Sequence, residues 1–312
     1  MAATSGATAL LFPGQGSQAV GMVGEWCDSH QPAARLFTRA SDILGYDLAA
    51  ICREGPAEKL NATAVSQPAI LVTSLAALEV LKARDPGLVA AVPITAGLSL
   101  GEYTALVFAG AVDFEDAVRL VDVRGRAMQE CAGQRGRDGT SAGGMVAVLG
   151  IERDTVAGLC AECRQDETLA VANVLCPGNI VVSGSTAACR RLEEAATAAG
   201  AMKCVRLEVA GAFHTRLMQD AVRKLSVALA ETTVRAPRIP VVSNVDARPH
   251  TDPAGIRSLL SRQVCSVVEW QESMEFLLAE GIRNVYEVGP GRVLRGLLKR
   301  IDRSVVCSGV PE

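Results

Sequence analysis

The sequence predicts an α/β protein with parallel strands and one inserted subdomain. Short apolar runs alternate with stretches in which apolar residues recur every three or four positions, a pattern typical of strands followed by helices. Strands are expected at residues 7–12 and 91–96, with helices between and after them. No charge run, Pro-rich stretch or Gly/Ser tract divides the 312 residues into separable halves, so we expect one compact unit.

A different order of elements begins near residue 145. After Phe213 the helix-rich pattern resumes, and it ends with a strand at 284–288 and a helix at 292–300. Between these points the order is βαββαβ, which predicts a ferredoxin-like unit inserted in the α/β core. The six expected elements of this unit are residues 145–150, 153–164, 169–173, 180–184, 186–199 and 203–209.

Composition argues against several classes of function. Apolar residues make up 49% of the chain and charged residues 21%, which is enough for a large core without disulfide or metal staples. A net charge of -3 and an aromatic content of 4% supply neither the basic surface nor the stacking rings of nucleic-acid binding. No apolar run approaches the roughly 20 residues of a membrane span and no signal sequence is visible, so a soluble, cytoplasmic protein is expected.

The ten cysteines are scattered along the chain, and only Cys160 and Cys163 lie close together. Without an export signal, reduced thiols are expected rather than a disulfide framework. A zinc site would need a second cysteine pair or a histidine pair, and the sequence has neither. We therefore expect no metal and interpret the pair as two thiols on a helix.

Two segments fit the nucleophile-elbow pattern G-x-S-x-G, at residues 97–101 and 139–143. The pattern alone is weak in a chain with 29 glycines, so the flanking elements must decide between Ser99 and Ser141. Ser99 follows the apolar run at 91–96 and precedes a helix start with an acid in its first turn. Ser141 follows a polar stretch and leads into a strand. The order of strand, elbow and helix favours Ser99 as the nucleophile.

A serine hydroxyl needs an adjacent base, usually histidine, to take its proton at neutral pH. The chain has three histidines. His30 and His250 lie in polar, turn-like segments and are expected at the surface. His214 comes shortly after the predicted strand that ends near Val209, at a strand-to-helix edge where the sites of α/β proteins gather. We therefore favour His214 as the catalytic base over an ordinary histidine at a helix start.

The segment after the first strand, residues 12–19, mimics the G-x-G-x-x-G/A fingerprint of a dinucleotide-binding loop. A dinucleotide-binding unit needs a second strand ending in an acid about 20 residues further on, whereas residues 33–44 have a helical pattern. The better interpretation is a glycine loop whose backbone N–H groups hold an oxyanion beside Ser99.

Arg124 lies on the apolar side of a helix predicted at 113–131. Spacings of three and four place it with apolar residues, whereas Arg119 and Arg126 face the opposite side. Burying an unpaired guanidinium would cost several kcal/mol, so we expect Arg124 to meet a carboxylate. That carboxylate belongs either to the protein, as an internal ion pair, or to a ligand.

Five blocks of sequence, in order along essentially the whole chain, together resemble malonyl-CoA:acyl-carrier-protein transacylases. Each block alone is unspecific, and their combination carries the resemblance. The blocks are FPGQGSQ at 12–18, GLSLGEY at 97–103, VRGRAMQ at 123–129, GAFH at 211–214 and EVGPG at 287–291. The resemblance implies a hydrolase-like α/β core with a ferredoxin-like insertion. It places the small subdomain at residues 140–208 and the large core at 1–139 and 209–312.

By resemblance, Ser99 is the nucleophile, His214 is its general base and acid, and the backbone N–H groups of Gln15 and Leu100 form the oxyanion hole. Arg124 would bind the free carboxylate of malonate. A planar guanidinium binds a carboxylate bidentately, which suits arginine better than lysine and discriminates malonyl from acetyl groups by charge. The implied partners are malonyl-CoA, as a substrate, and acyl carrier protein, with no cofactor.

In this family no aspartate completes the triad, and a main-chain carbonyl, which the resemblance assigns to Gln263, holds the imidazole of His214. Phe213 matches members that use malonyl units, and its bulk would crowd a branched α-carbon, so methylmalonyl is a secondary candidate. Two positions depart from the family pattern. Leu98 stands where the elbow usually has histidine, and Asn179 stands where glutamine is common. Neither departure removes a proton-transfer group.

Two other functions share part of this pattern. A serine esterase or thioesterase would use Ser99 and His214 but pass the acyl group to water, and Arg124 argues against a simple esterase. A catalytically idle homologue would bind carrier protein or CoA as a scaffold. The sequence leaves open whether the carrier serves fatty-acid or polyketide synthesis, with fatty-acid synthesis as our expectation. We expect a monomer that binds neither nucleic acid nor membrane.

The helix predicted at 292–300 carries cations at helical spacing, opposite its leucines, and we expect these cations to be exposed. They are Arg292, Arg295, Lys299 and Arg300. The plainer interpretation is a solvated helix face whose cations favour the helix C-terminus. The alternative is a docking surface for carrier protein, whose surface is typically acidic in families that feed it.

Overall fold

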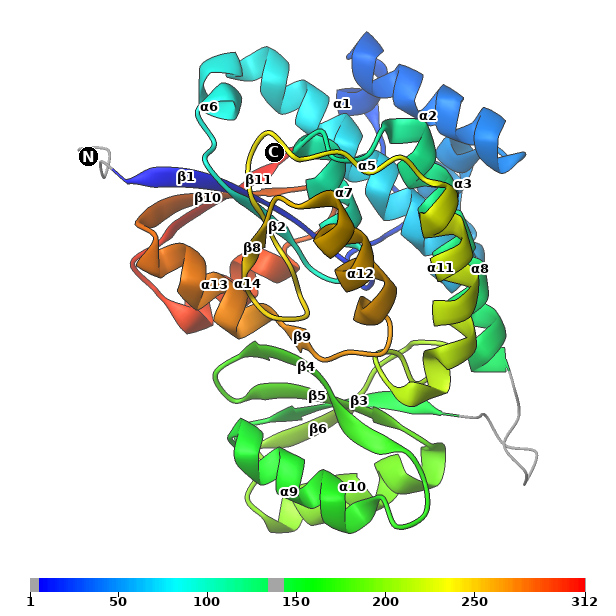
Figure 1. Ribbon diagram of the computed structural model, residues 1–312, viewed down its shortest axis with the longest axis vertical. Helices are drawn as coiled ribbons and strands as arrows, with labels where there is room; N and C mark the ends of the chain where they lie inside the picture. Colours follow the sequence, from blue (N-terminus) through cyan, green and yellow to red (C-terminus); the bar gives the residue numbers. More distant parts are fainter. Residues whose placement is uncertain (1–5, 134–142, 312) are drawn as a thin grey trace.

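The residues that the structure describes form two β-sheets, which lie in different parts of the molecule (Figure 1). The structure is a computed structural model and describes residues 6–133 and 143–311. The larger sheet is made of β1 (Ala7–Phe12), β2 (Thr95–Gly97), β7 (Val241–Val242), β8 (Pro249–His250), β10 (Ile282–Val288) and β11 (Val306–Val310). Its strand order is β11-β10-β1-β2-β7-β8, and every pair is parallel except β7 with β8.

Strand β1 shows how this sheet is buried on both faces. Because side chains alternate along a strand, Leu10 and Phe12 pack into one apolar core and Ala9 and Leu11 into another. The Ala9 and Leu11 face is covered by α13 (Trp270–Ala279) and α14 (Val293–Ile301). A mostly parallel sheet with helices on both faces is the predicted α/β architecture.

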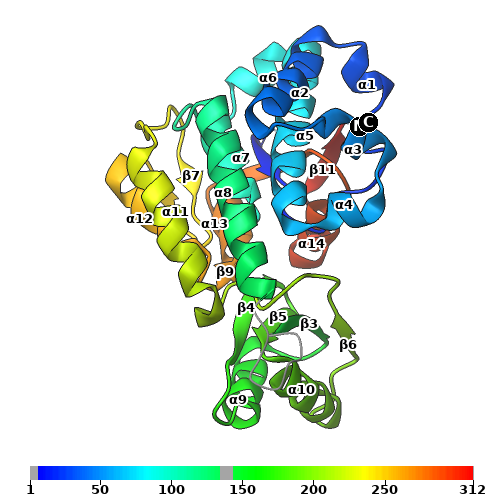
Figure 2. The same ribbon diagram turned by 90° about the vertical axis from the view of Figure 1, so that its right-hand side faces the viewer.

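The core on the Leu10 and Phe12 face is built from the other helices of this part of the chain (Figure 2). They are α1 (Glu25–Asp28), α2 (Gln31–Leu44), α3 (Leu48–Glu54), α4 (Ala57–Asn61), α5 (Thr63–Arg84), α6 (Pro86–Ala90), α7 (Gly101–Phe108), α8 (Phe114–Gly133), α11 (Gln219–Glu231) and α12 (Pro253–Gln263).

The smaller sheet lies at one end of the molecule, with two helices on the face turned away from the larger sheet (Figure 1). Its elements follow the predicted βαββαβ order: β3 (Gly144–Leu149), α9 (Arg153–Cys163), β4 (Leu169–Cys176), β5 (Asn179–Gly184), α10 (Thr186–Ala198) and β6 (Lys203–Arg206). These strands pair antiparallel in the order β6-β3-β5-β4. A fifth strand, β9 (Val268–Glu269), follows α12 in the chain and pairs parallel with β4, so a segment outside the predicted insertion completes this sheet.

Two predicted strands are shorter than expected. The strand predicted at 91–96 begins only at Thr95, because residues 91–94 lead out of α6 and Pro93 has no N–H to donate to a neighbouring strand. Strand β6 ends at Arg206 and not near Val209. The N–H of Leu207 still donates to the carbonyl oxygen of Met145 in β3, but the N–H of Val209 turns back to the carbonyl oxygen of Leu207, so the chain leaves the sheet there.

Helix α5 corrects the expectation that no segment is apolar enough to cross a membrane. By length and composition alone it is such a helix, with a mean hydropathy of 1.6 over its most apolar window. However, 78% of that window is buried inside the fold, where α5 packs between α2 and α8. The core helix of a globular protein has the same properties.

Candidate active site

Ser99 stands at the turn between β2 and α7. Its φ of 50° lies in the left-handed region, which a residue with a side chain occupies only under constraint. The flanking glycines make this turn possible. A Cβ on Gly97 would lie 2.0 Å from the backbone of Gly101, and one on Gly101 would lie 2.1 Å from the carbonyl oxygen of Phe12. The close approach of β1, β2 and α7 therefore requires glycine on both sides of Ser99.

The imidazole of His214 lies against Ser99. Ser99 Oγ and His214 Nε2 are 3.0 Å apart, and His214 Nδ1 is 2.9 Å from the carbonyl oxygen of Gln263. Because a carbonyl oxygen can only accept, Nδ1 carries the proton, and Nε2 can accept the proton of the serine. The three residues have the geometry of a nucleophile, its base and a group that orients the base.

His214 reaches Ser99 from the side of the smaller sheet. It lies in the turn that follows β6 and precedes a short 3-10 helix, η1 (Arg216–Met218), which leads into α11. The predicted strand-to-helix edge therefore belongs to the smaller sheet and not to the parallel one. His214 has a φ of 60°, so both residues of the pair are held in strained backbone conformations.

Burial keeps the His214 ring neutral. Desolvation, and after it the positive charge of Arg124, lowers the pKa of His214 to about 4. At neutral pH the ring therefore carries no charge and can act as a base through Nε2.

Arg124 is buried on α8, with only 2% of its surface exposed. Its Nη1 donates to Gln67 Oε1 at 2.8 Å, and its Nη2 donates to Ser99 Oγ and to Gln263 Oε1, both at 3.0 Å. The ring of Tyr103 lies 5.5 Å from the guanidinium carbon. Two neutral amide oxygens thus occupy the place expected for a carboxylate, and Arg124 forms no ion pair with any residue in the described part of the chain.

The glycine loop after β1 lies directly beside the elbow. A Cβ on Gly14 would lie 2.3 Å from the carbonyl oxygen of Leu98, so the loop and the elbow meet through their backbones. The backbone N–H groups of Gln15 and Leu100 donate to no acceptor within residues 6–133 and 143–311. Both groups are therefore available to an oxyanion formed next to Ser99.

Two further residues hold the elbow, and neither is among the site residues predicted from the sequence. Asn244, just after β7, accepts from the N–H of Ser99 and donates to the carbonyl oxygen of Gly97 at 2.8 Å. Glu102, in the first turn of α7, accepts from the backbone N–H of Asn244 and from the side-chain amide of Gln263. Signals for both were present. Asn244 is polar at the carboxyl end of a parallel strand, and Glu102 is the only charged residue of an otherwise apolar helix.

A cleft of about 150 Å³ opens in front of Ser99, and the predicted site residues other than Leu100 and Gln263 line it. Phe213, which is 4% exposed, forms part of its wall. Leu98 contributes another apolar side chain where a polar one is usual in the family. Asn179, the other departure, begins β5 and is not among the lining residues.

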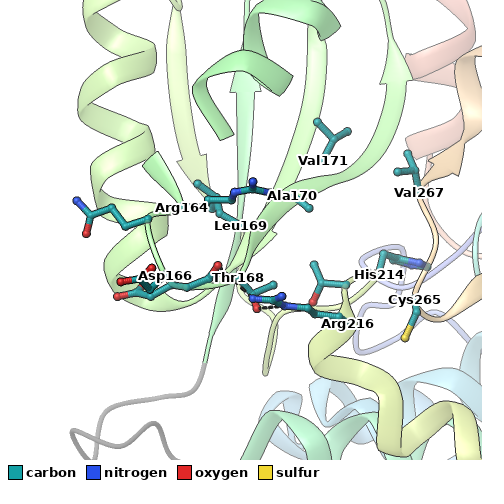
Figure 3. Close-up of a pocket in the computed structure, with 13 residues that line it drawn as sticks. Arg164, Asp166, Thr168, Leu169, Ala170, Val171, His214, Arg216, Cys265 and Val267 are labelled. Atoms are coloured by element: carbon teal, nitrogen blue, oxygen red, sulfur yellow. Dashed lines mark hydrogen bonds between the residues drawn. The ribbon is translucent and has the colours of Figure 1, made fainter. Parts of the chain in front are cut away.

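A wider cavity of about 540 Å³ reaches His214 from the smaller sheet (Figure 3). The loop before β4, the start of β4 and the segment after His214 line it, and Arg216 crosses it to donate to Thr168 Oγ1 at 2.8 Å. Its one thiol is that of Cys265, and burial raises the pKa of this thiol to about 11. Neither Ser99 nor Arg124 lines this cavity, whereas both line the smaller cleft together with His214.

The remaining candidates lie away from Ser99 or outside the described residues. Ser141 is in the segment 134–142, which the structure does not describe. His30 immediately precedes α2, and His250 hydrogen-bonds to an aspartate side chain four residues earlier. Cys160 and Cys163 both lie on α9 as free thiols. No group of His, Cys, Asp or Glu side chains within residues 6–133 and 143–311 is placed to hold a metal ion.

The predicted cationic face of α14 is only partly exposed. Arg292, Lys299 and Arg300 are exposed, but Arg295 has 15% of its side chain accessible and its Nε lies 3.3 Å from a carboxylate oxygen of Glu287. The expectation that all four cations are exposed is therefore wrong for Arg295. The leucines of α14 are buried as predicted.

Comparison with known proteins agrees with this geometry. Residues 9–305 match the model of the acyl transferase domain family. The chain is 43% identical over 304 residues to a malonyl CoA-acyl carrier protein transacylase of Salmonella typhimurium, covering 97% of this chain and 96% of the relative. An acyl carrier protein S-malonyltransferase of Vibrio cholerae is 40% identical, with a TM-score of 0.91 over 97% of this chain and 96% of that one.

A third similar protein was solved together with its partner. It is a malonyl-transacylase in complex with a type II PKS acyl-carrier protein, 38% identical to this chain with a TM-score of 0.92, covering 98% of this chain and 96% of that one. In all three comparisons the similarity extends over nearly the full length of this chain and of the other protein. The chain belongs to the acyl transferase family.

Proposed function

We propose that this protein transfers a malonyl group from malonyl-CoA to the phosphopantetheine thiol of acyl carrier protein, through a malonyl ester on Ser99. One observation carries the proposal. Ser99 Oγ lies 3.0 Å from a neutral histidine nitrogen and 3.0 Å from a buried guanidinium, so nucleophile, base and binding group for a carboxylate meet at one atom. The names of its relatives support the same substrates.

The first half-reaction acylates the serine. His214 Nε2 takes the hydroxyl proton as Ser99 Oγ attacks the thioester carbonyl. The N–H groups of Gln15 and Leu100 stabilise the oxyanion that forms on the carbonyl oxygen. The carbon–sulfur bond then breaks, and His214 returns its proton to the leaving thiolate of CoA.

The second half-reaction repeats these steps with the carrier as nucleophile. His214 takes the proton of the phosphopantetheine thiol, whose sulfur attacks the ester carbonyl of malonyl-Ser99. The carbon–oxygen bond breaks, and Ser99 Oγ regains a proton from His214. The carbonyl oxygen of Gln263 keeps the imidazole in the tautomer that both halves require.

Specificity is assigned to Arg124 and Phe213. Arg124 can exchange its hydrogen bonds to neutral amides for a bidentate pair with the malonyl carboxylate, which binds a guanidinium more strongly. Phe213 narrows the cleft next to His214 and disfavours a branched α-carbon. Together they select malonyl over acetyl and over methylmalonyl groups.

We further propose that residues 140–208 form the small subdomain and residues 1–139 and 209–312 the large core. The protein would act as a cytoplasmic monomer in fatty-acid synthesis, with no nucleic-acid or membrane partner. The site between the two units would then be complete in a single chain.

Intact mass spectrometry tests the transfer directly. Mixing the protein with malonyl-CoA should add one malonyl mass, and adding carrier protein should move that mass to the carrier. Ser99→Ala should gain no malonyl mass, whereas Ser141→Ala, the matched change in the other G-x-S-x-G segment, should behave as the parent. Labelling of Ser99→Ala, or loss of labelling in Ser141→Ala, would show that the elbow is wrongly chosen. Release of malonate to water in place of transfer would identify a thioesterase.

A further inference from the structure

Glu102 and Glu287 are the two carboxyl groups that are almost fully buried in the described part of the chain. Burying a carboxylate is costly unless hydrogen bonds replace its water. Glu287 accepts from two backbone N–H groups at the start of α14. Glu102 instead lies three residues after the nucleophile, and the transfer mechanism gives it no step.

One oxygen of Glu102 joins three segments that are distant in the chain. Its Oε2 accepts from the backbone N–H of Asn244 at 3.0 Å and from Gln263 Nε2 at 2.7 Å. The hydroxyl of Ser243 also hydrogen-bonds to this carboxyl group. The first turn of α7, the loop after β7 and the last residue of α12 are thereby tied together.

The two residues that Glu102 holds contact the backbone of Ser99, the ring of His214 and the guanidinium of Arg124. Asn244 clamps the backbone of the elbow on both sides of Leu98, through the N–H of Ser99 and the carbonyl oxygen of Gly97. Gln263 holds His214 through its main-chain carbonyl and Arg124 through its Oε1. Gln263 Nε2 also donates to the carbonyl oxygen of Ser99 at 3.0 Å.

Glu102 on one side and Arg124 on the other determine how the Gln263 amide is turned. The two orientations of an amide have nearly the same shape, but one presents NH₂ where the other presents oxygen. Burial raises the pKa of Glu102 to about 7, but Oε2 accepts both N–H bonds whether the acid is ionised or carries its proton on Oε1, and a guanidinium only donates. Placed between Glu102 and Arg124, Gln263 must therefore direct Nε2 toward Glu102 and Oε1 toward Arg124, as the distances of 2.7 and 3.0 Å show.

We propose that Glu102 is a positioning residue for acyl transfer, whose buried oxygen fixes Asn244 and Gln263 and through them the elbow, His214 and Arg124. This inference rests on the proposed role of Ser99. Without the acceptor, the buried N–H of Asn244 loses its partner, Gln263 keeps only its bonds to Ser99 and Arg124, and the strained elbow loses a support. The chemistry should then slow more than substrate binding weakens.

Three substitutions separate the position of the acceptor from its charge. Glu102→Gln keeps the shape and an oxygen for both donors, with its amide NH₂ available to the Ser243 hydroxyl. Glu102→Asp keeps the charge but withdraws the oxygen by one methylene group. Glu102→Ala removes the acceptor. Glu287→Ala is the matched control, because it removes the other buried carboxylate without a hydrogen bond to any reacting residue.

The measurement is the single-turnover rate of Ser99 acylation by malonyl-CoA and by acetyl-CoA, normalised to folded protein by circular dichroism. Glu102→Ala should lower the rate on the order of 100-fold, with a smaller change in KM, because reacting groups are displaced. The ratio of malonyl to acetyl transfer should fall as well, since Arg124 loses its orientation. Glu102→Gln should stay within about threefold of the parent, because the acceptor is retained. Glu102→Asp should resemble the alanine variant.

Acylation of folded Glu102→Ala at the parental rate and ratio would overturn the inference. The inference would also be overturned if Glu102→Asp were acylated fast and Glu102→Gln slowly, because the charge of the acceptor and not its position would then matter. If Glu102→Ala does not fold, the order of the other two variants decides. Folded Glu287→Ala should acylate Ser99 at the parental rate. An equal loss of rate in this variant would mean that removing any buried acid slows the reaction and that Glu102 has no special role. A parent enzyme that gains no malonyl mass on Ser99 would refute the proposed function itself.

Discussion

Arg124 affects the site in two ways, through the group it binds and through the charge it places next to His214. Its guanidinium donates to Ser99 Oγ and to two amide oxygens but has no carboxylate partner in the described part of the chain. Its charge also contributes to the low pKa of His214. Both effects can be measured separately.

Replacing Arg124 with alanine should remove the preference for malonyl groups. The ratio of malonyl to acetyl transfer should fall about 10- to 100-fold, the value of a lost charge-assisted hydrogen-bonded pair. Acetyl transfer should survive, because Ser99, His214 and the oxyanion loop remain. Arg126→Ala is the control on the same helix, since Arg126 is exposed and pairs with Asp122. An unchanged ratio in folded Arg124→Ala would assign Arg124 a structural role only.

The pH dependence of acylation should report the low pKa of His214. Because the ring is neutral above a pKa of about 4 and not 6.5, the rate of acylation by acetyl-CoA should persist below pH 6 and fall only near pH 4. In Arg124→Ala this acid limb should move to higher pH, although burial, the larger cause, remains. If the acylation rate of the parent protein already falls near pH 6.5, burial does not lower the pKa of His214.

The free energy of unfolding should also depend on the protonation of His214. A lowered histidine pKa stabilises the folded protein above pH 6.5, and this contribution is lost as the pH falls from 6.5 to about 4. The fraction folded must therefore be monitored at each pH of the activity profile.

Ser99, His214 and Arg124, which the structure brings together, could be selected from the sequence because their residue types are rare in such settings. A serine between two glycines after an apolar run, and an arginine on an apolar helix face, are visible as patterns. The contacts of the residues that hold them are not visible as patterns, although Asn244 is recognisable as a polar residue after a strand and the resemblance assigns the carbonyl group of Gln263. Asn244 and Gln263 act through backbone groups and amide orientation, which depend on how β7, α7 and α12 come together.

The sequence locates well the elements that have a strong apolar periodicity. It does not locate those whose extent depends on pairing with a neighbouring strand. Strand β1 has its predicted bounds, and α8 and α14 lie within two residues of theirs. Strand β9 has only two residues, and it forms because the segment that follows α12 pairs with the edge of β4. No periodicity is measurable over two residues, so its addition to the smaller sheet could not be predicted.

The junction of β1, β2 and α7 should be intolerant of any added side chain. In Gly101→Ala the Cβ would lie 2.1 Å from the carbonyl oxygen of Phe12, so backbone must move, and a loss of several kcal/mol in unfolding free energy is expected. Gly158→Ala, inside α9 with nothing within 4 Å of its Cβ, should instead stabilise by about 0.5–1 kcal/mol. Thermal unfolding of both variants tests this contrast. Equal melting temperatures would mean that the elbow is not tightly packed.

In the whole molecule, the cleft lies where the two sheets approach each other. His214 and Phe213 follow the smaller sheet, Ser99 and Arg124 belong to the core, and Val293 at the start of α14 also lines the cleft. One polar contact ties β9 to helix α9 of the smaller sheet, and another spans the junction. Arg153 of α9 forms a bidentate ion pair with Glu269 of β9, and Arg300 of α14 donates to the carbonyl oxygen of Pro177. Helix α14 is thus part of both the cleft and the junction.

This position makes α14 the candidate surface for an acidic carrier protein. Arg295 is unsuited to the test, because it pairs with the buried Glu287 and its loss would disturb the fold. Arg292→Glu with Lys299→Glu reverses two exposed charges and leaves that pair intact. The control is Lys82→Glu with Arg84→Glu, at the end of α5 next to α6, which lies far from the smaller sheet (Figure 1).

Electrostatic steering predicts how the two double variants should differ. At low salt, transfer from malonyl-Ser99 to the carrier should slow on the order of tenfold in the α14 variant and little in the α5 variant. The parental rate should fall with added salt and converge on that of the α14 variant, because salt screens exposed charges. Acylation from malonyl-CoA should respond less to these side chains, since it does not require the carrier. If carrier transfer and its salt dependence match the parent in the α14 variant, the carrier approaches the cleft over another surface, and Lys299 and Arg300 serve only to favour the C-terminal end of their helix.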